Sequence, residues 1–344
     1  MSKNLITAVP TRVIGPLYFK ALNGIHFKEH GQSIEVPLST FETTLFPSVS
    51  RGAKISRLTE NLTSTLLSDG MTRSLLLEST SVEESLHIVQ YLKSHIAFIQ
   101  DKIVSKHSKY ATLLKVDEAM VGHLLYLRFY FSTGNASGHN MSTFAVDQIA
   151  EHLLTLFSNV KYLSLSGNYC TDKKVSAVNR LLGRGKHVIS EIYIPRKIVE
   201  TDLKSTPEAM VDLHIKKNLI GSIISGGLLS GNAHYANMLL ATYLATGQDA
   251  ANIVEGSQGI THCEVKDNGL YLSVNIPNVI VGTVGHGKSD FQDRFEMMGC
   301  TGPHGSEKLA LIIGGVVLAG ELSLLAALTN QHELVKSHQA FERR

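Results

Sequence analysis

The stretch LALIIGGVVLAGELSLLAAL (residues 309–328) decides between a membrane protein and a soluble fold. It is the one run in the sequence with the length and apolarity of a membrane span. It contains three glycines and a single carboxylate, Glu321. Small residues let a helix pack closely against its neighbours, and a carboxylate is tolerated where protein partners surround it. We therefore expect a helix buried in the core of a soluble protein, and no membrane partner.

The composition agrees with a soluble chain. The 344 residues are 43% hydrophobic and 18% charged, which is typical of a globular protein with a large core. The net charge of +2 gives no field that would attract nucleic acid or an anionic membrane. The three cysteines form no C-x-x-C pair, and polar residues interrupt residues 1–13 too often for a signal sequence. We expect a cytoplasmic protein with no disulfide framework and no cysteine-bound metal.

Helical and strand patterns alternate upstream of the apolar run. They predict a small α+β unit over residues 74–164, between two polar loops at residues 69–73 and 166–174. Within this unit the patterns predict helices over 81–100 and 146–157, and strands over 123–132 and 161–165. After it they predict strands over 188–195 and 270–281, a helix that begins near Thr206, and helices over 233–246 and 291–298.

Two short motifs suggest a nucleotide or a metal site, and the context of each argues against it. GTVGHGKS at residues 282–289 fits the phosphate-binding loop G-x-x-x-x-G-K-[ST], but too little chain follows it to build a nucleotide-binding sheet. HFKEH at residues 26–30 fits the zinc pattern H-x-x-E-H, which requires a helix to place both histidines on one face. The flanking glycines predict a hairpin instead. We therefore expect neither a nucleoside triphosphate nor a metal.

Polar groups that can carry chemistry gather in four clusters. SLSGNYCTDKK at residues 164–174 combines hydroxyl, amide, carboxylate and ammonium groups. GNAHYAN at 231–237, ATGQD at 245–249 and LVKSH at 334–338 add amides, a carboxylate and imidazoles. Taken singly, each cluster fits a helix cap or a turn. Taken together, they resemble the hydroxymethylglutaryl-CoA (HMG-CoA) reductase family, in the order in which that family carries them.

Further motifs extend the resemblance over nearly the whole chain. They are IGPL at 14–17, SVSRG at 48–52, DGMTR at 69–73, GRGKHV at 183–188, KNLIGS at 217–222, ITHCEV at 260–265, GTVGHG at 282–287 and LAGELSLLAAL at 318–328. The Thr-Asp-Lys-Lys ending of the first cluster is nearer the class I pattern than the class II pattern. The family has a GTVGGG loop at position 282, which accounts for the coincidental phosphate-loop match.

The resemblance implies an α+β fold in two parts. A large domain, residues 1–73 and 165–344, would bind HMG-CoA around a central helix and form the dimer. A small inserted α+β domain, residues 74–164, would bind NAD(P), which agrees with the unit predicted from the patterns. Because the family's active sites form across a subunit interface, we expect a homodimer or a higher even oligomer.

The resemblance also implies which residues form the site. The catalytic group is Glu42, Lys173, Asp249 and His338. The residues expected to bind HMG-CoA or a related acyl-CoA are Ser48, Ser50, Lys54, Arg73, Ser166, Asn168, Lys174, Lys204, Lys217, His234 and Asn237. The residues expected to bind the cofactor are Ser108, Lys109, Asn135, Ala136, Ser137, Gly138, His139 and Asn140.

The residue types suit the reduction of a thioester to an alcohol, which takes two hydrides with loss of a thiolate between them. A Lys173 ammonium would stabilise the oxyanion that hydride transfer creates, and Asp249 beside it would keep it charged. His338 would protonate the departing thiolate near neutral pH. Glu42 would donate a proton to the aldehyde, provided that burial raises its pKa.

Two departures from the family pattern leave alternatives open. The cofactor motif DAMGMN reads NASGHN at residues 135–140, and Glu42 is followed by Thr-Thr instead of Gly-Cys. Lys109 favours NADPH by offering a charge for its 2′-phosphate, and NADH stays open. Three activities compete: an HMG-CoA reductase that feeds isoprenoid precursors through mevalonate, a reductase of a related acyl thioester in a specialised pathway, and a non-catalytic acyl-CoA-binding homologue. The presence of all four catalytic residues argues against the third.

Overall fold

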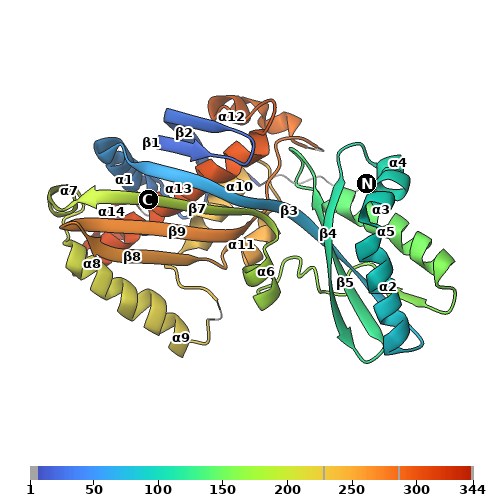
Figure 1. Cartoon of the computed structure of the whole chain (residues 1–344). Helices are drawn as coiled ribbons and strands as arrows, with labels where there is room; N and C mark the ends of the chain where they lie inside the picture. Colours follow the sequence, from blue (N-terminus) through green and yellow to red (C-terminus); the bar gives the residue numbers. More distant parts are fainter. Residues whose placement is uncertain (1–6, 228, 286, 342–344) are drawn as a thin grey trace.

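The computed structural model describes residues 7–227, 229–285 and 287–341. Their fold is a mixed α+β fold built on a long, curled sheet (Figure 1). The main part of the sheet has the strand order β2-β1-β3-β7-β9-β8, and neighbouring strands are antiparallel except β1 and β3. These strands are β1 (Thr11–Asn23), β2 (Lys28–Ser39), β3 (Leu62–Glu78), β7 (Gly185–Pro195), β8 (Ile260–Lys266) and β9 (Gly269–Val279). The strands predicted over 188–195 and 270–281 are thereby confirmed.

Strand β3 passes from the main part of the sheet into a second part. Its first half pairs with β7 as far as Gly70, and its second half pairs with β5 from Met71 onward. The loop predicted at residues 69–73 is therefore wrong, because this segment is continuous strand. Glycine, aspartate and threonine suggest a turn locally, but strands from distant parts of the chain supply the backbone hydrogen bonds here. The second part also contains β4 (Thr112–Val121), β5 (Leu124–Ser132) and β6 (Lys161–Ser164).

The predicted core helix is α13 (Gly305–Leu328), and it is confirmed as a buried helix. By length and composition it could cross a membrane, but 94% of its most apolar window is buried inside the protein. It packs against α1 (Leu45–Thr59), α10 (Tyr235–Ala245) and strand β7. Gly52 of α1 touches the helix so closely that a Cβ atom there would lie 2.2 Å from the carbonyl oxygen of Ala319. The backbones thus meet at a contact that only glycine allows.

Within the described part of the chain, buried apolar side chains form two clusters. One surrounds α13, and the other extends from Leu75 to Val160 between the second part of the sheet and helices α2 (Val82–Ser94) and α5 (His139–Leu156). The helix predicted over 81–100 ends at His95, whose φ of −119° is not helical. The chain then continues through α3 (Ile96–Ile99), η1 (Gln100–Val104) and α4 (Ser105–His107). The division into domains at residues 73/74 and 164/165 stays a prediction.

Short helices connect the strands of the main part. Thr206 caps α8 (Pro207–Leu213) by accepting a hydrogen bond from the Ala209 N–H, so the predicted helix start is confirmed. Helix α10 corresponds to the prediction over 233–246 and α12 (Gln292–Met297) to the one over 291–298. The remaining elements are α6 (Ala177–Leu182), α7 (Arg196–Asp202), η2 (His214–Gly221), α9 (Ser222–Ile224), η3 (Ala250–Asn252), α11 (Ile253–Gly256), η4 (Ser289–Phe291) and α14 (Glu333–Phe341).

The two rejected motifs have structural roles. Residues 24–27 form the turn between β1 and β2, and Asn23 pairs with Lys28, so the hairpin predicted at HFKEH is confirmed. In the GTVGHGKS segment, Lys288 is buried and its ammonium donates to the carbonyl oxygen of Gly247. Residue 286 of that segment lies outside the described residues.

Candidate active site

The loop that follows β6 presents the Thr-Asp-Lys-Lys sequence, and its backbone turns sharply to do so. Asn168, Thr171 and Lys173 all have positive φ values, of 57°, 49° and 57°. Such conformations cost free energy in residues other than glycine, and they persist where the surroundings fix them. Buried Cys170 anchors the loop, with its Sγ 3.5 Å from the Ser166 Oγ. The loop therefore has a defined shape that aims consecutive side chains in different directions.

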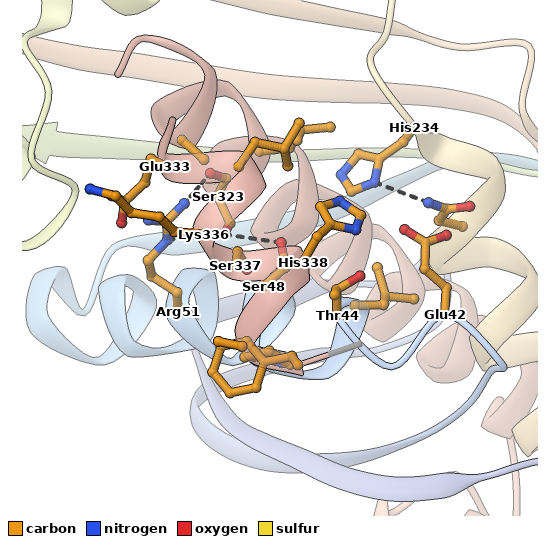
Figure 2. A pocket seen from close by; sticks show the side chains of 18 residues that line it. Glu42, Thr44, Ser48, Arg51, His234, Ser323, Glu333, Lys336, Ser337 and His338 are labelled. Atoms are coloured by element: carbon orange, nitrogen blue, oxygen red, sulfur yellow. Dashed lines mark hydrogen bonds between the residues drawn. The ribbon is translucent and has the colours of Figure 1, made fainter. Parts of the chain in front are cut away.

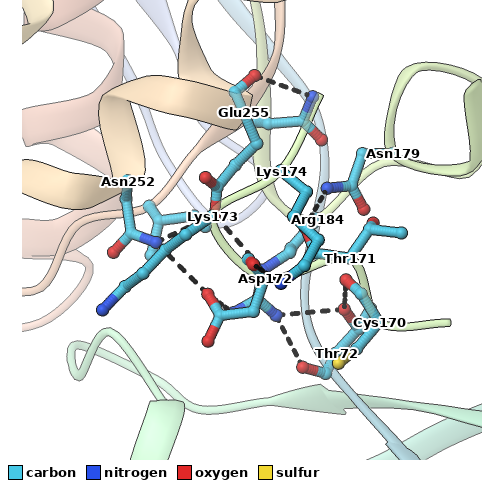
Figure 3. Close-up of polar contacts among 12 residues, drawn as sticks. Thr72, Cys170, Thr171, Asp172, Lys173, Lys174, Asn179, Arg184, Asn252 and Glu255 are labelled. Atoms are coloured by element: carbon cyan, nitrogen blue, oxygen red, sulfur yellow. Dashed lines mark hydrogen bonds and ion pairs between the residues drawn. The ribbon is translucent and has the colours of Figure 1, made fainter. Parts of the chain in front are cut away.

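A buried guanidinium holds Asp172 in the centre of this loop (Figure 3). Arg184, which has no exposed side-chain surface, donates to the Asp172 Oδ1 at 2.7 Å and to the Thr72 carbonyl oxygen at 2.6 Å. Burial by itself would raise the pKa of Asp172, but the charge and hydrogen bond of Arg184, together with the nearby His139 and Arg73, outweigh it and lower that pKa. Arg73 also approaches Asp172, at 3.9 Å. Asp172 is thus a carboxylate of the loop that Arg184 holds in place.

Lys173 and Asp249 form an ion pair at the surface of the loop, with 2.7 Å between Nζ and Oδ2. Asp249 is held in place because its Oδ1 accepts the N–H of Ala251 at the start of η3. The hydrogen bond that the Lys173 ammonium donates to Asp249 raises the pKa of Lys173. Burial opposes ionisation of Asp249, but the hydrogen bonds from Lys173 and from the Ala251 N–H, together with the Lys173 charge, outweigh it and lower the pKa of Asp249. The pair therefore presents a charged ammonium that is still 41% exposed and can reach a ligand.

The predicted cofactor segment, residues 135–140, lies against this loop. The Nε2 of His139 is 4.0 Å from the Asp172 Oδ1, and burial lowers the pKa of His139 to about 4. Gly138 has a φ of 89°, and a Cβ atom there would collide with the Thr133 side chain at 2.6 Å. Asn135 accepts the Ser306 N–H and donates to the Gly302 carbonyl oxygen. An aspartate could make only the first of these bonds, which gives the departure at Asn135 a structural reason.

A cavity of about 530 Å³ collects a second set of predicted residues. Glu42, Ser48, His234, Asn237 and His338 all line it. Figure 2 shows the imidazoles of His234 and His338 and the carboxylate of Glu42 turned toward the same space. The Asn237 amide lies 3.5 Å from the His234 Nδ1, and the Ser48 hydroxyl donates to Ser323 of the core helix. The cavity can therefore hold a polar group beside a carboxylate and two imidazoles.

Two contacts fix the walls of this cavity. The hydroxyl of Thr43 donates to the carbonyl oxygen of Phe341 at 2.7 Å, so the loop that carries Glu42 is tied to the end of the helix that carries His338. Glu321 of the core helix accepts the backbone N–H groups of Ala233 and His234. This carboxylate orients the start of α10.

The other predicted residues are spread more widely. Lys54 pairs with Asp202 at 2.7 Å, and Lys204 has a φ of 55°. Lys217 lies in η2 and donates to the Asn218 side chain. Ser50, Lys54, Lys204 and Lys217 do not line the cavity. Lys174, Asn168, Ser166 and Arg73 belong to the Lys173 loop or contact it, whereas Ser108, Lys109, Ala136, Ser137 and Asn140 belong to the segments predicted to bind the cofactor.

The four predicted catalytic residues thus fall into two groups within one chain. Glu42 and His338 line the cavity, and neither Lys173 nor Asp249 does. Sequence reasoning did not assign roles to Arg184 and Thr43. Arg184 stands inside the quoted GRGKHV motif, but only the folded chain reveals that it contacts Asp172. Thr43 appeared as a departure from the family pattern, and its bond to the C-terminal helix has no local signal.

Comparisons with known proteins agree with the motifs. The family model described as hydroxymethylglutaryl-coenzyme A reductase matches residues 9–343. The chain is 42% identical to the 3-hydroxy-3-methylglutaryl-coenzyme A reductase of Pyrococcus horikoshii, over 98% of this chain and 82% of the relative. It is 39% identical to the enzyme of the same name from Methanothermobacter thermautotrophicus, over 98% of this chain and 83% of the relative.

The fold has a counterpart among solved structures. The class II 3-hydroxy-3-methylglutaryl-CoA reductase of Streptococcus pneumoniae, in a structure described as bound to NADPH in open conformations, aligns with a TM-score of 0.75. The alignment covers 96% of this chain and 78% of that chain. Because the sequence identity is 17%, the similarity shows a shared fold and not a shared activity. With the family match over nearly its whole length and relatives at about 40% identity, the chain belongs to the hydroxymethylglutaryl-CoA reductase family.

Proposed function

We propose that this protein reduces HMG-CoA to mevalonate and free CoA, with two NADPH as hydride donors. The observation that carries the proposal is the 2.7 Å ion pair between Lys173 and Asp249, at the end of a loop whose Asp172 is fixed by buried Arg184. The curated relatives are named for this reaction. Those names disfavour both the related acyl thioester and the non-catalytic homologue.

Lys173 supplies the charge that the reaction needs. Hydride addition to a carbonyl produces an oxyanion, and a preorganised cation stabilises that charge more strongly in the transition state than in the ground state. Asp249 keeps the ammonium protonated and oriented. Asp172 within the loop and Arg73 beside it would orient the polar end of the substrate.

His338 and Glu42 are the proposed proton donors of the reaction. Reduction of the thioester ends with cleavage of the carbon–sulfur bond, and the thiolate of CoA takes a proton as it leaves. His338 on α14 is placed to donate that proton. The aldehyde then accepts the second hydride, and its oxygen takes a proton from Glu42 or Lys173.

The segment with the second apolar cluster is suited to the dinucleotide. NADPH supplies the hydrides when it is bound. The 18-residue helix α5 begins at His139 with no acidic residue in its first turn, which favours a pyrophosphate at its N-terminus. The buried Nε2 of His139 has no hydrogen-bond partner among the residues that the structure describes, so it can donate to or accept from a bound ligand. Exposed Lys109 would contact the 2′-phosphate.

A homodimer would bring the two catalytic groups together. Ile223 and Ile224 are 74% and 82% exposed at the end of the helical segment that carries Lys217. Exposed apolar side chains of this kind are typical of subunit interfaces. In the proposed dimer, Glu42 and His338 of one chain complete a site with Lys173 and Asp249 of its partner.

Complementation between two inactive variants tests this arrangement. Glu42→Gln and Lys173→Ala are each expected to lose at least about a hundredfold in kcat. When the two variants are mixed and allowed to exchange subunits, heterodimers contain one site with both wild-type residues. Random exchange predicts recovery of roughly a quarter of wild-type activity.

Two controls make the result decisive. A mixture of Lys173→Ala with Asp249→Asn should recover nothing, because both changes fall in the same group. Native mass spectrometry would verify that subunits exchange. If heterodimers form and activity does not return, the proposal that sites are shared between chains is wrong.

A further inference from the structure

A cluster of two histidines and one glutamate contains none of the proposed site residues, although it adjoins Ser306, whose N–H donates to Asn135 of the predicted cofactor segment. His26 stands in the turn between β1 and β2, and His304 and Glu307 stand at the start of α13. One donor atom from each of the three side chains lies within 4.8 Å of the others. The Glu307 Oε1 is 2.5 Å from the His26 Nδ1 and 3.4 Å from the His304 Nδ1.

These distances are close to those of a metal site. Zinc binds imidazole nitrogen and carboxylate oxygen at about 2.0–2.2 Å, so two ligands of a tetrahedral ion are about 3.3 Å apart. The His304–Glu307 distance already has this value, and the His26–Glu307 distance needs to widen by under about 1 Å. The two imidazole rings stack with their centroids 4.7 Å apart, which keeps both Nδ1 atoms beside the same carboxylate.

The carboxylate is held in position by the protein. Glu307 is 6% exposed, and its Oε2 accepts the N–H of Ile25 at 2.9 Å, which leaves Oε1 facing the histidines. A Cβ atom at Gly24 would lie 2.5 Å from the Phe27 ring and 2.9 Å from the same Oε2, so glycine at residue 24 lets the turn pack closely on both side chains. The imidazoles of His26 and His304 are 57% and 41% exposed, so an ion can enter from solvent.

We propose that His26, His304 and Glu307 bind one zinc ion, with water as the fourth ligand, and that the ion clamps the β1–β2 turn to the start of the core helix. Two imidazoles and one carboxylate with an open position form a donor set that zinc prefers. The proposal does not depend on the reductase activity. It also assigns His26 without the other histidine of the HFKEH motif, because His30 lies in β2, where it pairs with Ala21.

Metal binding by the full-length protein tests the proposal. The protein is stripped with a chelator, dialysed and titrated with Co²⁺, whose visible absorption reports coordination, and the cobalt is then displaced with Zn²⁺. Isothermal titration gives the zinc stoichiometry, and thermal unfolding with and without Zn²⁺ gives the shift in Tm. The variants are His26→Gln and His304→Gln, with His30→Gln as the matched control on the same hairpin.

We expect the wild type and His30→Gln to bind one Zn²⁺ per chain with equal affinity and to gain Tm when zinc is added. His26→Gln and His304→Gln should each lose about tenfold or more in affinity, together with the gain in Tm. Both substituted side chains are well exposed, so circular dichroism should show folded variants. Absence of saturable binding by the wild type, or binding that survives in the His26→Gln/His304→Gln double variant, would overturn the proposal.

Discussion

Replacement of Glu321 tests how the core helix supports the site. This carboxylate is 1% exposed and accepts three hydrogen bonds, from the backbone N–H groups of Ala233 and His234 and from the hydroxyl of Thr261. In Glu321→Leu, the two backbone N–H groups stay buried without an acceptor, whereas the Thr261 hydroxyl keeps the Tyr235 hydroxyl as a partner at 3.2 Å. Each unsatisfied donor costs about 1 kcal/mol or more, so the free energy of unfolding should fall by at least about 2 kcal/mol.

Glu321→Gln separates the hydrogen bonds from the charge. The amide oxygen can accept both backbone N–H groups, and the amide nitrogen can donate to the hydroxyl of Thr261. This variant should therefore lose only about 1 kcal/mol. Glu264→Gln is the control, because that carboxylate is 48% exposed on neighbouring strand β8 and should change stability by under about 0.5 kcal/mol.

Urea unfolding at a fixed protein concentration measures these differences, since stability of an oligomer depends on concentration. The opposite expectation also has a physical basis, because an apolar residue can replace a buried charge at no cost when the charge is poorly compensated. If Glu321→Leu unfolds within about 1 kcal/mol of the wild type, the hydrogen bonds do not hold the start of α10, and the reasoning fails.

Three further predictions concern the tail, pH and the cofactor. Thr43→Val removes the bond to Phe341 and should lower kcat several-fold while the KM for NADPH stays constant, and an unchanged kcat would contradict a role for this contact. Burial lowers the pKa of both His139 and His214 to about 4, so each stays neutral when folded, and the stability present above pH 6.5 should be lost as pH falls toward 4. At pH 5 the free energy of unfolding is lower by about 2 kcal/mol for each histidine. In chemical denaturation, the His139→Gln/His214→Gln double variant should therefore show a free energy of unfolding that depends less steeply on pH. A dependence as steep as that of the wild type would refute the assignment. Lys109→Ala should raise the KM for NADPH several-fold and leave that for NADH unchanged, so equal effects on both cofactors would remove Lys109 from the phosphate site.

Local patterns predicted the secondary structure well where periodicity and capping decide it. The apolar run became α13, Thr206 capped α8, and HFKEH formed a hairpin. The pattern failed at residues 69–73, where pairing with β7 and β5 turns a loop-like composition into strand. It also missed the break at His95, because the apolar stripe continues past a residue whose backbone leaves the helix.

The residues of the candidate site were likewise predicted from the sequence only in part. Two separate motifs predicted Lys173 and Asp249. The fold brings the Lys173 Nζ to 2.7 Å from the Asp249 Oδ2. Arg184 and Thr43 escaped notice because their roles consist of contacts with residues far along the chain. Whether the predicted site residues act as assigned stays a prediction, since only activity measurements test their roles.

The stoichiometry of NADPH oxidation with HMG-CoA tests the central claim most directly. The purified protein is given limiting HMG-CoA and excess NADPH, and the absorbance of the reduced nicotinamide is followed while free thiol and mevalonate are quantified. We predict two NADPH oxidised, one CoA thiol released and one mevalonate formed for each HMG-CoA consumed. No oxidation of NADPH, or oxidation that proceeds with another acyl-CoA and not with HMG-CoA, would contradict the account.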